Sequence, residues 1–202
     1  MRWMTMAAVL AGAGIVSGCA QISLMTKSVD YMAIAGDIED AEGVAVDMPG
    51  GGTAEYDGIV GIGARYRDGG VLMMGDAALT ADFGAGTIDG VMDDFVVAEI
   101  DGDVDIDEFL MSPIRSLFQF ETADGRLDLS NGRITGSDFE ADFDGRITTD
   151  AHVYRADGTL YGVFRGADAE LLEAWAHMND MTLRRGGSDA TDVELYLAAE
   201  AD

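Results

Sequence analysis

Alternation of larger and smaller or polar residues with a period of two is the feature that most restricts what this sequence can fold into. Leu79, Ala81 and Phe83 alternate with small or polar residues, a Gly-Ala-Gly break follows at 84–86, and alternation then resumes. This is the pattern of a β-strand, a tight turn and a second β-strand. The same pattern recurs along most of the chain after Thr53, which predicts an all-β domain.

Glycine-containing turn signals divide this region into short strands. The first strand begins at Thr53 and stops at Asp68-Gly69-Gly70, and a final strand is expected over Val193, Leu195 and Leu197. Residues 167–181 form the one long stretch with possible helical spacing. Further hairpin turns are predicted at Asn131-Gly132, Asp144-Gly145 and Asp157-Gly158.

About eight strands within roughly 150 residues indicate an antiparallel β-barrel, in which closure leaves no free edge strand. A β-sandwich is the main structural alternative.

The N-terminal residues have the composition of an export signal. Arg2 precedes an apolar run from Met6 to Val16, which is too short for a stable transmembrane span. Val16-Ser17-Gly18-Cys19 resembles the lipobox of bacterial lipoproteins, which implies cleavage before Cys19 and a diacylglycerol on its sulfur. A plain signal peptide or an uncleaved anchor is the alternative.

Three regions follow from these observations. Residues 1–18 are predicted to be a lipoprotein signal peptide, residues 19–52 the lipidated cysteine and a flexible tether, and residues 53–202 the barrel. The tether has no sustained period and ends in Pro49 and three glycines, with at most a short helix or strand near Tyr31–Ile34. Ala20 after the cysteine favours the outer membrane, by resemblance to enterobacterial sorting rules.

Charge and cysteine content exclude several kinds of partner. The sequence carries 12 basic and 38 acidic residues, for a net charge of −26, which repels nucleic acid and anionic lipid headgroups. We therefore expect no nucleic-acid partner. The excess of acidic residues either keeps the protein soluble or forms an acidic docking surface for a basic partner. Cys19 is the only cysteine, so the chain can form no internal disulfide and no cysteine-based metal site.

Two short motifs resemble ligand-binding loops only in part. The glycines at 84–90 have the wrong spacing for a dinucleotide loop, and no helical pattern follows them. Asp101, Asp103 and Asp105 match the first ligands of a calcium loop, but Ile106 stands where glycine is needed and Ser112 where the closing Glu should be. A solvated loop or strand face is the preferred interpretation, with a weak surface calcium site as the alternative, and we predict no metal and no cofactor.

Catalysis has little support in the residues. His152 and His177 are the only histidines, and no nucleophile elbow occurs. His152 is expected on a strand face, and His177 in packing or at a rim, with haem ligation as the alternative. We therefore predict a protein that is not an enzyme. A hydrolase using paired carboxylates remains the alternative.

Aromatic residues are the candidates for an interface, because aromatic anchors dominate binding hot spots. They are Tyr154, Tyr161, Trp175 and Tyr196, each of which could equally pack inside a barrel. The loop expected at residues 93–116, rich in Gly and Asp, is a second candidate contact region.

Four segments together resemble the barrel domains of transferrin-binding protein B-like lipoproteins. "MPGGGTAEYDGIVGI" from Met48 and "GDAALTADFGAGTIDG" from Gly75 resemble the entry strand and first hairpin. "ITGSDFEADFDG" and "DGTLYGVFRGADAELLEAW" resemble later strands, although residues 163–166 and 173–175 depart from the family pattern. The resemblance implies an eight-stranded barrel on a lipid anchor at the outer membrane, and it carries over no ligand.

From this resemblance we expect a lipid-anchored, monomeric, non-catalytic binding module for a protein or small solute, with iron acquisition as one candidate role. Transferrin binding itself is not expected, because the chain has room for one barrel and little of the handle domain of the two-lobed receptors. Which membrane face the barrel occupies stays open. The alternative is a structural or protective envelope lipoprotein without a specific ligand.

Overall fold

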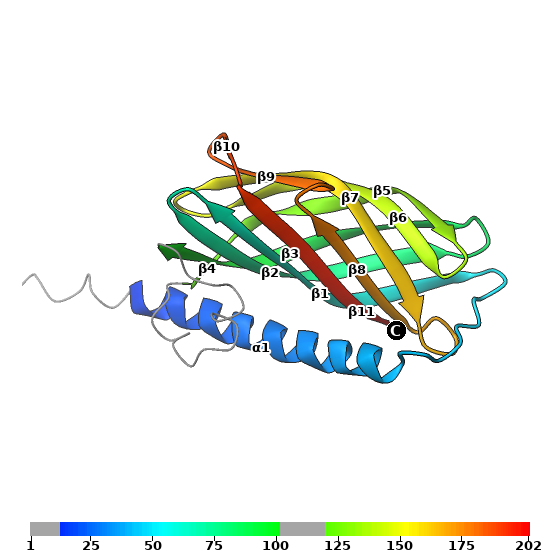
Figure 1. The fold of residues 1–202 in the computed structure, drawn as a ribbon. Helices are drawn as coiled ribbons and strands as arrows, with labels where there is room; N and C mark the ends of the chain where they lie inside the picture. Colours follow the sequence, from blue (N-terminus) through cyan, green and yellow to red (C-terminus); the bar gives the residue numbers. More distant parts are fainter. Residues whose placement is uncertain (1–12, 102–119) are drawn as a thin grey trace, which may run out of the picture.

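The computed structural model describes residues 13–101 and 120–202, and within them the chain forms one helix followed by a series of antiparallel strands (Figure 1). The helix is α1 (Ala13–Asp40). The strands are β1 (Thr53–Tyr66), β2 (Gly69–Asp82), β3 (Thr87–Asp101), β4 (Phe120–Thr122), β5 (Asp124–Thr135), β6 (Asp138–Thr148), β7 (Val153–Arg165), β8 (Leu171–His177), β9 (Met181–Arg185), β10 (Ser188–Asp189) and β11 (Asp192–Ala201).

Eight of these strands close into a barrel, which confirms the predicted fold class. The order around the barrel is β1-β2-β3-β5-β6-β7-β8-β11, and β11 pairs with β1 to complete the ring. The short strand β4 lies along β3 next to the start of β5, and β9 continues along β7 beyond the end of β8. The β9–β10 hairpin projects from one end of the barrel (Figure 1).

The inside of the barrel is packed with side chains. One continuous cluster of buried residues includes Tyr56, Met73, Phe95, Phe143 and Phe164. Alternate residues of each strand point inward, which is the pattern that the sequence shows as a period of two. The barrel is therefore built around a solid core.

The turn prediction at 84–86 is confirmed, but three others are wrong. The glycines at 132, 145 and 158 lie within β5, β6 and β7, and the β5–β6 turn falls at residues 136–137. A Cβ on Gly145 would lie 2.1 Å from the carbonyl oxygen of Arg126, and one on Gly132 would lie 1.9 Å from that of Ile88. These glycines permit close approach of neighbouring strands rather than a reversal of the chain.

Two other expectations are corrected by the fold. Residues 167–181 have helical spacing, but within them Leu171–His177 form the strand β8. The strand buries apolar residues on both faces: its inner face packs in the barrel core, and Leu171 packs under α1. Most of the expected tether is helical, since α1 continues to Asp40 and only residues 41–52 are irregular. The final strand is confirmed as β11, and residues 93–101, expected in a loop, belong to β3.

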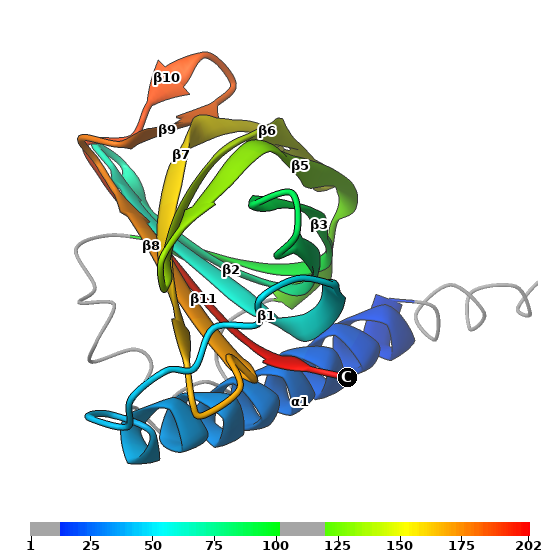
Figure 2. The same cartoon turned by 90° about the vertical axis from the view of Figure 1, so that its right-hand side faces the viewer.

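The helix α1 lies along the outside of the barrel (Figure 2). Ala20 and Leu24 pack in a cluster with residues of β1 to β4, and Ile34 and Ile38 pack on Leu171 of β8. Within the described residues, no helix is long and apolar enough to cross a membrane.

A partly buried ion pair also holds α1 on the barrel wall. Lys27, the one lysine in the sequence, contacts the carboxylate of Asp76 and lies 3.0 Å from Oδ2 of Asp94. The Lys27 side chain is almost completely buried, whereas both aspartates are at least half exposed.

Candidate binding face

Three of the four aromatic residues singled out in the sequence meet on the outer wall of the barrel. Tyr161 of β7 lies directly opposite Trp175 of β8, and Trp175 lies directly opposite Tyr196 of β11. The inward positions of β8 are filled by Leu172, Ala174 and Ala176, so Trp175 between them points outward. The three rings therefore form one row across three adjacent strands, which we call the aromatic row.

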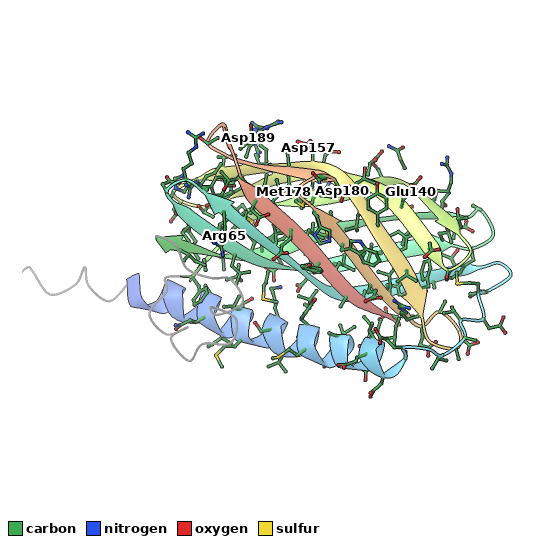
Figure 3. The ribbon with its side chains drawn as sticks, viewed as in Figure 1. Arg65, Glu140, Asp157, Met178, Asp180 and Asp189 are labelled. Carbon is green, nitrogen blue, oxygen red and sulfur yellow. The ribbon has the colours of Figure 1, made fainter. Side chains whose placement is uncertain are left out.

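The aromatic row is accessible. Tyr161 is 39% exposed and Tyr196 is 42% exposed, although large aromatic side chains are usually more deeply buried than this. His177 extends the apolar surface, because its ring stands edge-on to that of Tyr196 at 5.8 Å. Met178, which is 53% exposed, follows in the connection from β8 to β9 (Figure 3).

A bare stretch of strand adjoins the row on its other side. Gly61 of β1 lies directly opposite Tyr196, and a Cβ placed on Gly61 would find only the carbonyl oxygen of Tyr196, at 4.0 Å. Unlike Gly145, Gly61 is not required by a close neighbouring backbone. The absence of a side chain here leaves the β1 backbone accessible next to the ring of Tyr196.

Carboxylates flank the aromatic row. Glu194 accepts a hydrogen bond from the hydroxyl of Tyr196 at 3.4 Å, and Glu173, two residues from Trp175, accepts one from Nε of Arg165 at 2.8 Å. An aromatic centre with a charged rim is the usual composition of a protein-binding surface.

Tyr154, the fourth aromatic residue, lies elsewhere and has a different role. It is fully buried inside the barrel and donates a hydrogen bond to Oε1 of Glu99 at 2.6 Å. Burial and this hydrogen bond raise the pKa of the Tyr154 hydroxyl. Tyr154 therefore belongs to the core and is not part of the aromatic row.

Polar residues close the end of the barrel around Tyr154. Glu99 also lies 3.4 Å from Nε2 of His152, and the guanidinium of Arg185 stands 4.3 Å over the ring of Tyr66. Arg185 in turn contacts the carboxylate of Asp68. His152 is therefore held at the rim of the barrel, close to the strand position that the sequence predicted.

A cavity of about 760 Å³ opens at this end. It is lined by Tyr66, Asp68, His152, Arg185 and part of the β9–β10 hairpin. The hydroxyl of Tyr66 is buried and has no hydrogen-bond partner among the described residues. Burial raises the pKa of Tyr66 to about 12, against the opposing effect of Arg185, so its hydroxyl keeps its proton at neutral pH and can donate a hydrogen bond.

A second, smaller hollow of about 390 Å³ lies between α1 and the barrel wall. Its lining is rich in carboxylates, contributed by Asp30, Asp57, Asp76, Asp93 and Glu200. Over the described ranges, no three metal-ligating side chains are grouped closely enough to hold a metal ion. The acidic motif that begins at Asp101 lies almost entirely in residues 102–119, outside the described residues.

Comparison with known proteins gives no family. No family model matches the chain, and no curated protein matches it. Among solved structures, the chain is similar to the vaccine antigen transferrin-binding protein B from Haemophilus parasuis Hp5, in a double-mutant form. The identity is 14%, the TM-score is 0.37, and the match covers 76% of this chain and 26% of that one. At these values we assign neither family nor function from the likeness.

Proposed function

We propose that this chain is an outer-membrane lipoprotein, anchored through Cys19, whose barrel is a non-catalytic protein-binding module. The observation that carries the binding role is the register Tyr161–Trp175–Tyr196, which aligns three partly exposed aromatic residues on one wall. Aromatic side chains at the centre of an interface contribute most of its binding energy.

The barrel wall is a better candidate surface than the barrel interior. Eight-stranded barrels that enclose a ligand keep an internal space for it. Here Tyr56, Phe95, Phe143 and Phe164 fill the interior, and each is at most 1% exposed. A partner therefore binds outside, where Gly61 and the aromatic row together offer backbone and ring surface.

The charged residues around the aromatic row indicate the composition of the partner's surface. The row is flanked by Glu173 and Glu194 on a chain of net charge −26. A protein surface with apolar side chains surrounded by Lys or Arg is complementary to it, and the opposite charges would speed the encounter.

Retention of an envelope protein on immobilised chain tests the binding role. Trp175→Ala is expected to weaken retention at least tenfold, because hot-spot truncations cost about 2 kcal/mol or more. Val153→Ala, at a comparably exposed position of β7, should bind like the wild type. Gly61→Val should fold normally yet block the surface beside Tyr196. Equal retention by all four proteins would count against the proposal.

Metabolic labelling with radioactive palmitate tests the anchor separately. The wild-type chain should be labelled and should sediment with outer membranes, whereas Cys19→Ser should be neither labelled nor processed. An unlabelled wild-type chain would contradict the lipoprotein proposal and would leave the proposed binding role unaffected.

The cavity beside Tyr66 supports a second candidate function, the binding of a small solute. The unpartnered hydroxyl offers a hydrogen bond to an acceptor atom on a ligand, and iron acquisition is one role such a site could serve. Thermal-shift screening with haem and iron complexes tests it. A genuine ligand should stabilise the wild type and lose its effect in Tyr66→Phe, whereas an unchanged melting temperature throughout would exclude this candidate.

A further inference from the structure

The helix α1 is apolar on two opposite faces, and the barrel covers only one of them. Leu24, Ile34 and Ile38 are buried against the barrel wall. On the other side the spacing of three and four residues aligns a second set, which we call the outer stripe. It consists of Ile22, Met25, Val29 and Met32, which are 68%, 63%, 59% and 59% exposed.

The outer stripe explains why this segment shows no helical period in its sequence. A helix with one apolar face shows a one-sided period of 3.6 residues, whereas apolar residues on both sides remove that asymmetry. A helix of this kind is normally covered on both sides. The outer stripe is therefore a surface that lacks its cover in the isolated chain.

We infer that the cover is a lipid bilayer, and that α1 lies between the barrel and the membrane surface. This inference rests on the anchor proposed above. Cys19 is part of α1 and precedes Ile22 by three residues, about 4.5 Å of helix rise. Acyl chains on Cys19 would hold the start of the stripe at the headgroup layer, and an apolar face of a surface helix inserts at that depth.

The charge pattern of α1 limits the insertion to its first part. The outer stripe ends at Met32, whereas Asp37, Glu39 and Asp40 near the end of the helix are exposed acids that remain in water. The stripe thus extends from Ile22 to Met32, about 15 Å along the helix. A second copy of the chain fits this face less well, because two molecules of charge −26 repel one another.

The chain allows a direct test, because acylation of Cys19 leaves no other thiol. In the mature acylated protein, Met25→Cys or Met32→Cys supplies a single thiol that can carry an environment-sensitive fluorophore. The matched control is Met178→Cys, at a methionine of similar exposure in the connection from β8 to β9, away from α1. Vesicles of the zwitterionic lipids phosphatidylethanolamine and phosphatidylcholine, with a lipid-attached quencher, then report contact with the bilayer, and melting curves verify that each variant folds.

The inference predicts that labels at Met25 and Met32 shift to the blue and are quenched severalfold more strongly by the lipid quencher than the label at Met178. Vesicles that carry the protein while all three labels respond only to an aqueous quencher would overturn it and leave the anchor intact. Disulfide-linked dimers through Met25→Cys would also overturn it, by assigning the face to a second copy. If the protein does not float with vesicles at all, both the proposed lipid anchor and this inference are contradicted.

Discussion

Arg146 lies directly opposite Arg155 in the pairing of β6 with β7. Arg126 lies opposite Arg146 on the other side, and Arg184 lies opposite Arg155, so four arginines form a row across four strands. Arg126 and Arg184 have carboxylate partners at 2.9 Å, in Asp128 and Asp189. Neither Arg146 nor Arg155 has an ion-pair partner among the residues that the structure describes. Like charges placed directly opposite one another destabilise a sheet.

Replacing one central arginine should therefore stabilise the barrel. Arg155→Gln is expected to raise the free energy of unfolding by about 0.2–1 kcal/mol at low salt, and the gain should shrink as salt screens the repulsion. Arg133→Gln is the control, because Arg133 is far from the row and lies 3.9 Å from Glu140. Urea denaturation at two ionic strengths measures both, and a loss of stability in Arg155→Gln would contradict the account.

Adding a methyl group should separate two kinds of glycine. Gly145→Ala places a Cβ 2.1 Å from the carbonyl oxygen of Arg126, so the strands must move apart. We expect a loss of about 1–3 kcal/mol or more in unfolding free energy. Gly61→Ala meets only one atom at 4.0 Å and should be neutral or stabilising by about 0.4–1 kcal/mol. Similar changes in unfolding free energy at both positions would show that the close approach of the neighbouring strand does not require glycine at position 145.

Docking of α1 on the barrel should depend on the sign of the charge at position 27. Lys27→Glu places a third carboxylate beside Asp76 and Asp94, and the helix should open. Lys27→Met keeps an aliphatic side chain and leaves two solvated aspartates, so we expect the helix to stay docked. Amide hydrogen exchange over residues 20–40 measures this. Equal protection in wild type and Lys27→Glu would contradict a role for the ion pair.

Stability should fall at alkaline pH because of buried tyrosines. Burial raises the pKa of Tyr56 and of Tyr66 to about 12, above the ordinary value of 10.0. Between these values the unfolded chain loses protons that the folded chain keeps, so rising pH favours unfolding. The free energy of unfolding should be flat below pH 10 on this account and decrease from about 10 to 12. Tyr66→Phe should flatten the decrease, and an unchanged slope would show that Tyr66 does not contribute.

The alternation of residues with a period of two made the barrel predictable. The Asn-Gly and Asp-Gly pairs, which usually mark hairpin turns, predicted its turns at the wrong positions. Residues 84–86 form the predicted turn, but Asp144-Gly145 and Asp157-Gly158 lie within strands. A glycine serves a turn or a close backbone contact equally well, and only the position of the neighbouring strand distinguishes the two uses. The helix α1 was not predicted because apolar residues lie on both of its sides: Ile22 and Leu24, two residues apart, point to nearly opposite sides of it.

The candidate binding face was predictable in its residues and not in its geometry. The sequence singles out Tyr161, Trp175 and Tyr196 as large aromatics, but nothing local reveals that they pair across strands. Register depends on where β7, β8 and β11 meet, and residues 167–181 carried a misleading helical spacing. The position of Gly61 directly opposite Tyr196 depends on the same kind of register, between β1 and β11.

Site-specific photocrosslinking in living cells can show whether the aromatic row contacts a partner protein. A photoreactive amino acid in place of Tyr196 should give one discrete crosslinked species of higher mass, and the same species should form from position 161. The probe in place of Arg133, which is exposed on β5, should give none. We also expect the crosslinked species to disappear when Trp175→Ala is added to either probe variant. If positions 196 and 133 give the same pattern, or if neither crosslinks, the aromatic row is not the binding face.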